Sequence, residues 1–72
     1  MKNYIVNGRY IVEEMDVDID LDNSIFGYCA CEDCYVLVCN YDYTDVRFVG
    51  WPYDPWEEIV SCALMIDIRM GL

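Results

Sequence analysis

The sequence predicts a single α+β domain, in which a mostly antiparallel sheet of four or five strands is followed by one C-terminal helix. Short β-favouring segments, separated by turn residues, occupy the chain as far as Trp51. A helix-start pattern and apolar residues at helical spacing follow. Because 72 residues accommodate one domain, we expect residues 1–72 to fold as a single unit.

The first two strands are predicted to form a hairpin. Asn7-Gly8 separates two β-favouring runs, and this dipeptide suits a type I′ turn, which needs a positive φ at both central positions. We expect the second strand to continue through residues 14–22, with a bend or bulge at Glu13, because this acid stands at an otherwise apolar odd position. The later strands are predicted at residues 25–31, 35–39 and 46–51.

The helix is predicted to begin within residues 54–57, which read DPWE. This order places Asp54 at the N-cap, Pro at the first helical position and Glu at the third. The later residues 64–70 fit either a helix or a strand, because their apolar side chains also alternate. We expect a helix from about residue 55 to about residue 65, followed by a short last strand.

Acidic residues dominate the charge of the chain. Fourteen Asp and Glu oppose four Lys and Arg, which gives a formal net charge of -10. Between Arg9 and Arg47 there are ten acids and no base. Such a field repels nucleic acid and anionic membranes and attracts basic surfaces. We therefore expect no direct binding of nucleic acid or membrane, and a partner that is itself a nucleic-acid-binding protein.

The segment EMDVDIDLD concentrates this charge, with acids at every even position and apolar residues at every odd one. Strict alternation predicts a half-buried strand with one apolar and one wet face. The carboxylates would then recur about every 6.6 Å along the strand. These acids, called the acidic ladder below, are Glu14, Asp16, Asp18, Asp20 and Asp22, and the apolar residues between them are Met15, Val17, Ile19 and Leu21.

Three interpretations of the acidic ladder remain open at this point. The first is a solvated outer face that keeps a sheet edge from pairing. The second is a calcium loop of the EF-hand type, which is disfavoured because Leu21 and Gly27 stand where that loop needs Gly and Glu. The third is mimicry of a phosphate backbone, in which carboxylates at this spacing occupy a Lys/Arg groove.

The cysteines have a spacing, C-x-C-x2-C-x4-C, that would suit a zinc site formed by Cys29, Cys31, Cys34 and Cys39. Structural zinc sites more often contain two separated C-x2-C pairs, and free Cys is a common small core residue. We therefore predict packed thiols and no obligatory metal. The first residues lack the continuous apolar segment of an export signal, and no run of about 18 apolar residues occurs, so reduced thiols in a cytosol are expected.

Aromatic residues suggest further contact surfaces. Tyr41, Asp42, Tyr43 and Asp45 combine rings that stack on Arg with acids that pair with it, and we expect them to extend the contact with a basic partner. The aromatic residues 51–56 fit either a hydrophobic latch on the sheet or part of a binding hot spot.

Catalysis has little support in the sequence. The chain contains no His, so a Ser–His or Cys–His pair does not exist, and no Gly-rich phosphate loop is present. We expect a binding protein that is not an enzyme and that uses no cofactor.

In size, in charge and in the run EMDVDIDLD, the chain resembles small acidic inhibitors made by phages and mobile elements. Anti-CRISPR proteins, uracil-DNA-glycosylase inhibitors and antirestriction DNA mimics belong to this group. The resemblance implies a stoichiometric inhibitor in the host cytosol that occupies the basic nucleic-acid-binding surface of a host defence protein. The alternative is a small structural or assembly protein, a homodimer whose acidity serves solubility. A zinc-binding module formed by the cysteines is the third hypothesis.

Overall fold

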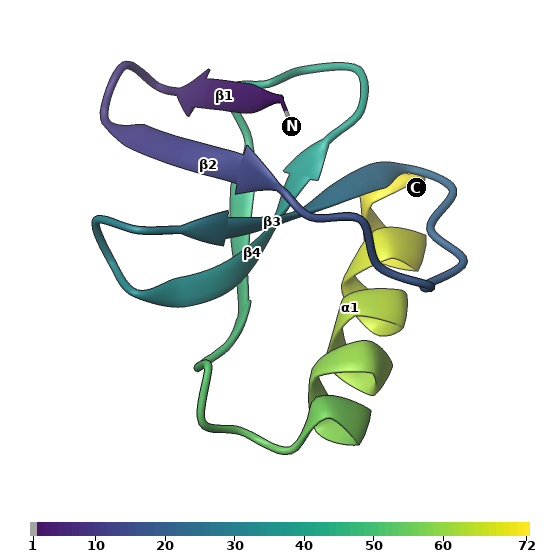
Figure 1. Cartoon of the computed structure of the whole chain (residues 1–72). Coiled ribbons are helices and arrows are strands. Elements are labelled where there is room, and N and C mark those ends of the chain that lie inside the picture. The colour runs from purple at the N-terminus through teal and green to yellow at the C-terminus, as the bar shows by residue number, and fades with distance from the viewer. Residues whose placement is uncertain (1) are drawn as a thin grey trace.

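A computed structural model describes residues 2–72 as five antiparallel strands in sequential order and one helix packed against the sheet (Figure 1). The predicted α+β class, with its antiparallel sheet and C-terminal helix, is confirmed. The elements are β1 (Asn3–Val6), β2 (Tyr10–Glu14), β3 (Ser24–Cys29), β4 (Cys34–Cys39), β5 (Val46–Gly50) and α1 (Trp56–Met70).

The hairpin between β1 and β2 has the predicted turn. Asn7 and Gly8 have φ values of 55° and 67°, and Arg9 N–H donates to the Val6 carbonyl at 3.0 Å. Two consecutive residues with positive φ define the type I′ geometry, which matches the right-handed twist of the flanking strands.

The strand predicted for residues 14–22 is wrong beyond its first residue, because β2 ends at Glu14. Glu13 pairs in register with Asn3 and with Tyr28, so the bulge predicted there is also wrong. The chain leaves the sheet after β2 because the following apolar side chains pack against the helix-facing core instead of forming a ladder. A register shift lies elsewhere, between β4 and β5.

The core is divided between the two faces of the sheet. On one face, α1 covers a cluster that contains Phe26, Leu37, Val49, Ile59 and Ala63. On the other face, a second cluster contains Val6, Val12, Cys29, Cys34, Val36 and Val38. Alternate residues of β3 and β4 therefore serve opposite clusters, as the period of two along a strand requires. A sheet that is buried on both faces explains why β3 and β4 are almost continuously apolar.

The helix begins one residue later than predicted and has a different cap. Pro55 occupies the N-cap position, and no side chain caps the helix. Asp54 instead accepts a hydrogen bond from Trp51 N–H at 2.8 Å, within the turn that leads from β5 to α1. The predicted capping role of Asp54 is therefore wrong, because its carboxylate accepts from a backbone donor in the turn and not from the helix.

The helix also continues without interruption to Met70, so the short last strand is wrong. Ile59, Ala63 and Asp67 are buried at intervals of four residues, and this helical stripe faces the sheet. Gly71 is the C-cap residue, and a Cβ atom there would lie 2.6 Å from Asn23 Nδ2, so this position has no room for a side chain unless Asn23 moves. No helix within residues 2–72 is long and apolar enough to cross a membrane.

Candidate partner-binding surface

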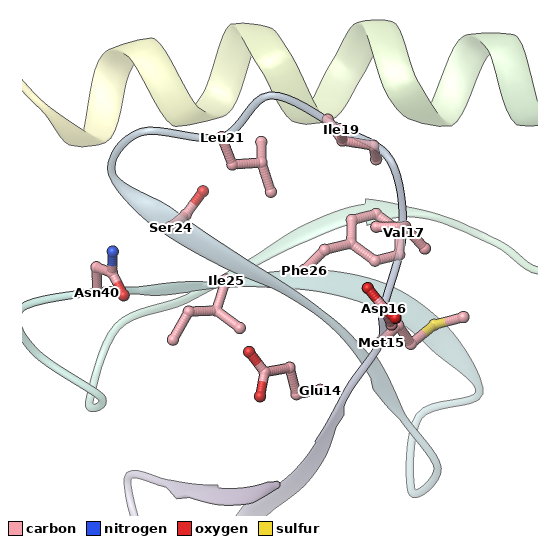
Figure 2. Close-up of a pocket in the computed structure, with 10 residues that line it drawn as sticks. All are labelled: Glu14, Met15, Asp16, Val17, Ile19, Leu21, Ser24, Ile25, Phe26 and Asn40. Atoms are coloured by element: carbon pink, nitrogen blue, oxygen red, sulfur yellow. The ribbon is translucent and has the colours of Figure 1, made fainter. Parts of the chain in front are cut away.

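The acidic ladder lies on an extended connection from β2 to β3 (Figure 1). Met15 N–H donates to the Phe26 carbonyl at 3.0 Å, which is the last bond between this segment and β3 before the chain departs. Leu21 N–H donates to the Ile19 carbonyl at 2.9 Å, so the chain bends at Asp20. Figure 2 shows the connection passing between β3 and α1. The carboxylates therefore follow an arc and not a straight strand.

Exposure alternates along this connection as the sequence pattern predicted. The apolar residues Met15, Val17, Ile19 and Leu21 are half-buried against the helix-facing cluster. The aspartates between them, Asp16, Asp18, Asp20 and Asp22, are exposed, and Glu14 is half-buried. Because each apolar neighbour is held by the core, the carboxylates between them are directed outward without any β-ladder.

The end of the connection is fixed by Asp67, a buried carboxylate of α1 with 3% of its surface exposed. Its oxygens accept hydrogen bonds from the N–H groups of Asp22 at 2.9 Å and Asn23 at 2.8 Å, and from the Ser24 hydroxyl. The Asn23 side-chain amide also donates to the Asp67 carbonyl at 2.9 Å. One helical residue therefore ties the last turn of α1 to the start of β3.

The hydrogen bonds around Asp67 decide its ionisation. Burial by itself raises the pKa of this carboxyl, but the Ser24 hydroxyl and the backbone N–H groups of residues 22–24 outweigh it and bring the pKa below its ordinary value. Sequence reasoning missed this residue. One feature of the sequence could have indicated it: Asp67 stands four residues after Ala63, at the next position of the apolar stripe that begins at Ile59. A charged residue on a buried stripe requires hydrogen-bond partners.

A hollow of about 460 Å³ lies beside the ladder. Its lining combines the carboxylate side chains of Glu14 and Asp16 with apolar side chains from the connection and β3 (Figure 2). Asn40, at the start of the loop between β4 and β5, lines the same hollow, and its N–H donates to the Asn23 carbonyl at 3.0 Å. The structure therefore brings the loop that contains the candidate Tyr residues next to the acidic connection.

A second contact joins this loop to the start of the ladder. Tyr43 stacks on Tyr4, with ring centroids 4.9 Å apart and planes inclined by 21°. The Tyr4 hydroxyl donates to Glu14 Oε2 at 3.4 Å. Burial, and then the Glu14 charge, raise the pKa of the Tyr4 hydroxyl, which keeps it a donor. One face of the Tyr43 ring is therefore used in a contact within the chain, although 45% of the residue's surface is exposed.

The remaining residues of the predicted tyrosine loop differ in how much of each side chain is free to contact a partner. Asp42 Oδ1 accepts from the Thr44 hydroxyl at 2.6 Å and from its N–H at 3.0 Å, and these bonds lower the pKa of Asp42. Asp45 forms an ion pair with Arg47 at 3.1 Å. Tyr41 is 79% exposed. Of this loop, Tyr41 presents the largest side-chain surface to a partner, while both acids are engaged locally.

The carboxylates of the acidic ladder form no ion pair within residues 2–72. Within residues 2–72, the pair of Asp45 and Arg47 is the ion pair that the structure contains. The exposed carboxylates of the connection have no cation within salt-bridge distance in this part of the chain. The surface can therefore attract a cationic group without first breaking an internal pair.

The four candidate zinc ligands do not come together. Cys29 and Cys34 face each other across the β3–β4 ladder, and Cys31 lies in the turn between them. Cys39 is at the opposite end of β4, about 17 Å from Cys34 along an extended strand. Among the described residues, no group of three or more His, Cys, Asp or Glu side chains could hold a metal ion. The arrangement does not support a tetrathiolate zinc centre.

The aromatic residues near the start of α1 have two different environments. The Trp56 ring packs edge-on against Phe26 at 5.7 Å and Tyr35 at 6.1 Å, and so acts as a latch between helix and sheet. Trp51 and Tyr53 are exposed, and their rings are parallel within 6° at a centroid distance of 6.2 Å. The latch interpretation therefore describes Trp56, whereas Trp51 and Tyr53 leave ring surface exposed.

Comparisons with protein-family models, with curated proteins and with solved structures found no match.

Proposed function

We propose that this protein is a stoichiometric inhibitor, active in the host cytosol, that binds a basic nucleic-acid-binding surface of a host defence protein. The acidic ladder takes the place of the phosphates, and Tyr41 extends the contact. The observation that carries this proposal is the row of exposed carboxylates, Asp16 to Asp22, none of which forms an ion pair within residues 2–72. These four aspartates are part of the excess of acids that gives the chain a formal net charge of -10.

Preorganisation supports binding by this row. The half-buried Val17 and Ile19 hold the middle of the connection on the core, and Asp67 holds its end. A carboxylate on a fixed backbone loses less conformational entropy on binding than one on a mobile loop. Mutual repulsion between neighbouring carboxylates is relieved when a cationic groove is bound.

The test is competition between the inhibitor and nucleic acid. A pull-down from host lysate first identifies the partner, and the partner's own DNA or RNA is then displaced with increasing inhibitor at two salt concentrations. We expect displacement by the wild type, weakening as salt rises, because both ligands use the same Lys and Arg side chains. The triple variant D16N/D18N/D20N should displace nucleic acid less well.

A matched variant separates local recognition from net charge. E32Q/E57Q/E58Q also removes three exposed negative charges, but from the β3–β4 turn and the first turn of α1. It should compete as the wild type does. Equal potency of wild type and D16N/D18N/D20N would eliminate the ladder as the phosphate substitute. Simultaneous binding of inhibitor and nucleic acid to the partner would eliminate direct competition.

One observation favours the structural alternative, a homodimer. Apolar side chains of α1 are exposed, Leu64 by 37%, Met65 by 56% and Ile68 by 64%, and Leu72, which follows the helix, is exposed by 99%. The charged residues among positions 59–72 are the buried Asp67 and a single base, Arg69, so two copies can meet here without opposing their acidic surfaces. Sedimentation of the wild type and I68E decides this. A dimer that I68E dissociates supports it, and a monomeric wild type at high concentration excludes it.

A further inference from the structure

The turn between β3 and β4 places two thiols in contact. Cys29 is the last residue of β3, and Cys31 follows within the turn. Their Sγ atoms are 3.1 Å apart. Cys29 has 1% of its surface exposed, whereas Cys31 is exposed. A buried and an accessible sulfur therefore lie side by side at the surface of the cluster on the face opposite α1.

We propose that Cys29 and Cys31 are a dithiol site that reacts reversibly with low-molecular-weight disulfides such as glutathione disulfide. The site is independent of the proposed inhibitor function. It lies on the β3–β4 turn, whereas the acidic ladder lies on the connection before β3.

The geometry requires a small movement to close the bond. A disulfide has a sulfur–sulfur length of about 2.05 Å, so the two Sγ atoms must approach each other by about 1 Å. The turn provides this movement at little cost, because residues 30–33 are exposed and lie outside both strands. A hollow of about 230 Å³, lined by Cys29 together with Tyr10 and Trp51, leaves space beside the buried sulfur.

The reaction proceeds by two thiol–disulfide exchanges. The exposed Cys31 thiolate attacks one sulfur of glutathione disulfide, forms a mixed disulfide and releases one glutathione thiolate. The Cys29 thiolate then attacks the Cys31 sulfur, forms the internal disulfide and releases the second glutathione thiolate. The two protein thiols are oxidised by two electrons, glutathione disulfide is reduced to two glutathiones, and their protons pass to the released thiolates. Excess reduced glutathione reverses both steps.

Cys34 is the third thiol near this pair, directly opposite Cys29 in the β3–β4 ladder. It is buried, with 4% of its surface exposed. Burial, followed by the proximity of Cys29, raises the pKa of Cys34 to about 11, so it is protonated at neutral pH. Burial, followed by the hydrogen bond with Cys31, raises the pKa of Cys29 as well, so the choice between the two thiols is geometric. The Cys29 Sγ lies 3.1 Å from the Cys31 Sγ, and we therefore expect Cys29 to attack the mixed disulfide at Cys31.

The experiment is a redox titration of the full chain with mixtures of reduced and oxidised glutathione, followed by acid quenching, alkylation and peptide mass mapping. The wild type should lose two hydrogens at oxidising ratios, and the link should map to Cys29 and Cys31. C31S should lose this internal link. C39S is the matched control, because it removes a half-buried thiol at the far end of β4 and should form the link as the wild type does.

Circular dichroism of C31S confirms that the exposed substitution preserves the fold, and C31A repeats the test without a hydroxyl. A wild type that forms no internal link at any glutathione ratio would overturn the proposal. An internal link in C31S equal to that of the wild type, or a wild-type link that maps to Cys34, would also overturn it.

Discussion

The acidic ladder and Asp67 contain the same chemical group in opposite environments. The carboxylates of Asp16, Asp18 and Asp20 are exposed, whereas Asp67 is buried and accepts bonds from three consecutive residues at the end of the connection. A solvated carboxylate contributes little to folding and stays available to a partner. A buried carboxylate that satisfies several donors is committed to the structure. The charge of a residue therefore does not reveal its role, whereas its burial and its partners do.

The largest expected effect is at the buried carboxylate. Asp67→Ala should lower the free energy of unfolding by about 3 kcal/mol, because it leaves backbone N–H groups of the Asp22–Asn23 turn without an acceptor. Urea denaturation measures the difference. Asp67→Asn, which retains one acceptor oxygen at the same volume, should lose less. A midpoint unchanged in Asp67→Ala would show that the turn does not depend on this residue.

Acid should weaken the same hydrogen bonds between Asp67 and the Asp22–Ser24 turn. The pKa of Asp67 is lower in the folded chain than its ordinary value of 3.8, so the unfolded chain binds the proton more tightly. The contribution of Asp67 to stability is thus complete above that ordinary value and is lost as pH falls through the folded pKa. The difference in unfolding free energy between wild type and Asp67→Asn should shrink in this acid range. A constant difference would contradict the assignment.

A smaller effect is expected at Asp54, whose side chain is half-buried, between the exposed ladder and the buried Asp67. Its bond to Trp51 N–H is within a half-exposed turn, and it does not cap α1. Asp54→Ala should cost about 1 kcal/mol, the net value of one hydrogen bond. Asp54→Asn retains an acceptor oxygen and should recover most of this loss. If the helix signal in circular dichroism also fell at low temperature, Asp54 would have a role at the helix start.

The smallest effect on stability is expected from the ladder. D16N/D18N/D20N should change the free energy of unfolding by less than about 0.5 kcal/mol, because the three side chains are exposed and form no ion pair in the described chain. Any change should be towards greater stability, since mutual repulsion is removed. Thermal unfolding at low salt is the sensitive measurement. A loss above 1 kcal/mol would mean that these carboxylates have structural partners.

Local chemistry made several features of this protein readable from its sequence. The Asn7-Gly8 turn was predictable because few dipeptides accept two positive φ values, and the antiparallel sheet followed from short apolar runs between turn residues. The alternating exposure of residues 15–22 was also predictable, because an extended chain directs successive side chains to opposite sides. That property belongs to any extended segment, so it could not distinguish a strand from a connection.

Other features depend on contacts between residues far apart in the sequence, and only the tertiary structure decided them. Residues 15–22 became a connection whose apolar side chains pack against the helix-facing cluster, which β3, β4, β5 and α1 contribute. Residues 64–70 continue the helix, and there Asp67 accepts hydrogen bonds from the Asp22–Ser24 turn, more than forty residues earlier. Asp54 turned towards Trp51 because the path from β5 brought that N–H within 2.8 Å. In each case, the sequence determined which groups need a partner, and only the folded chain determined which partner is near enough to serve.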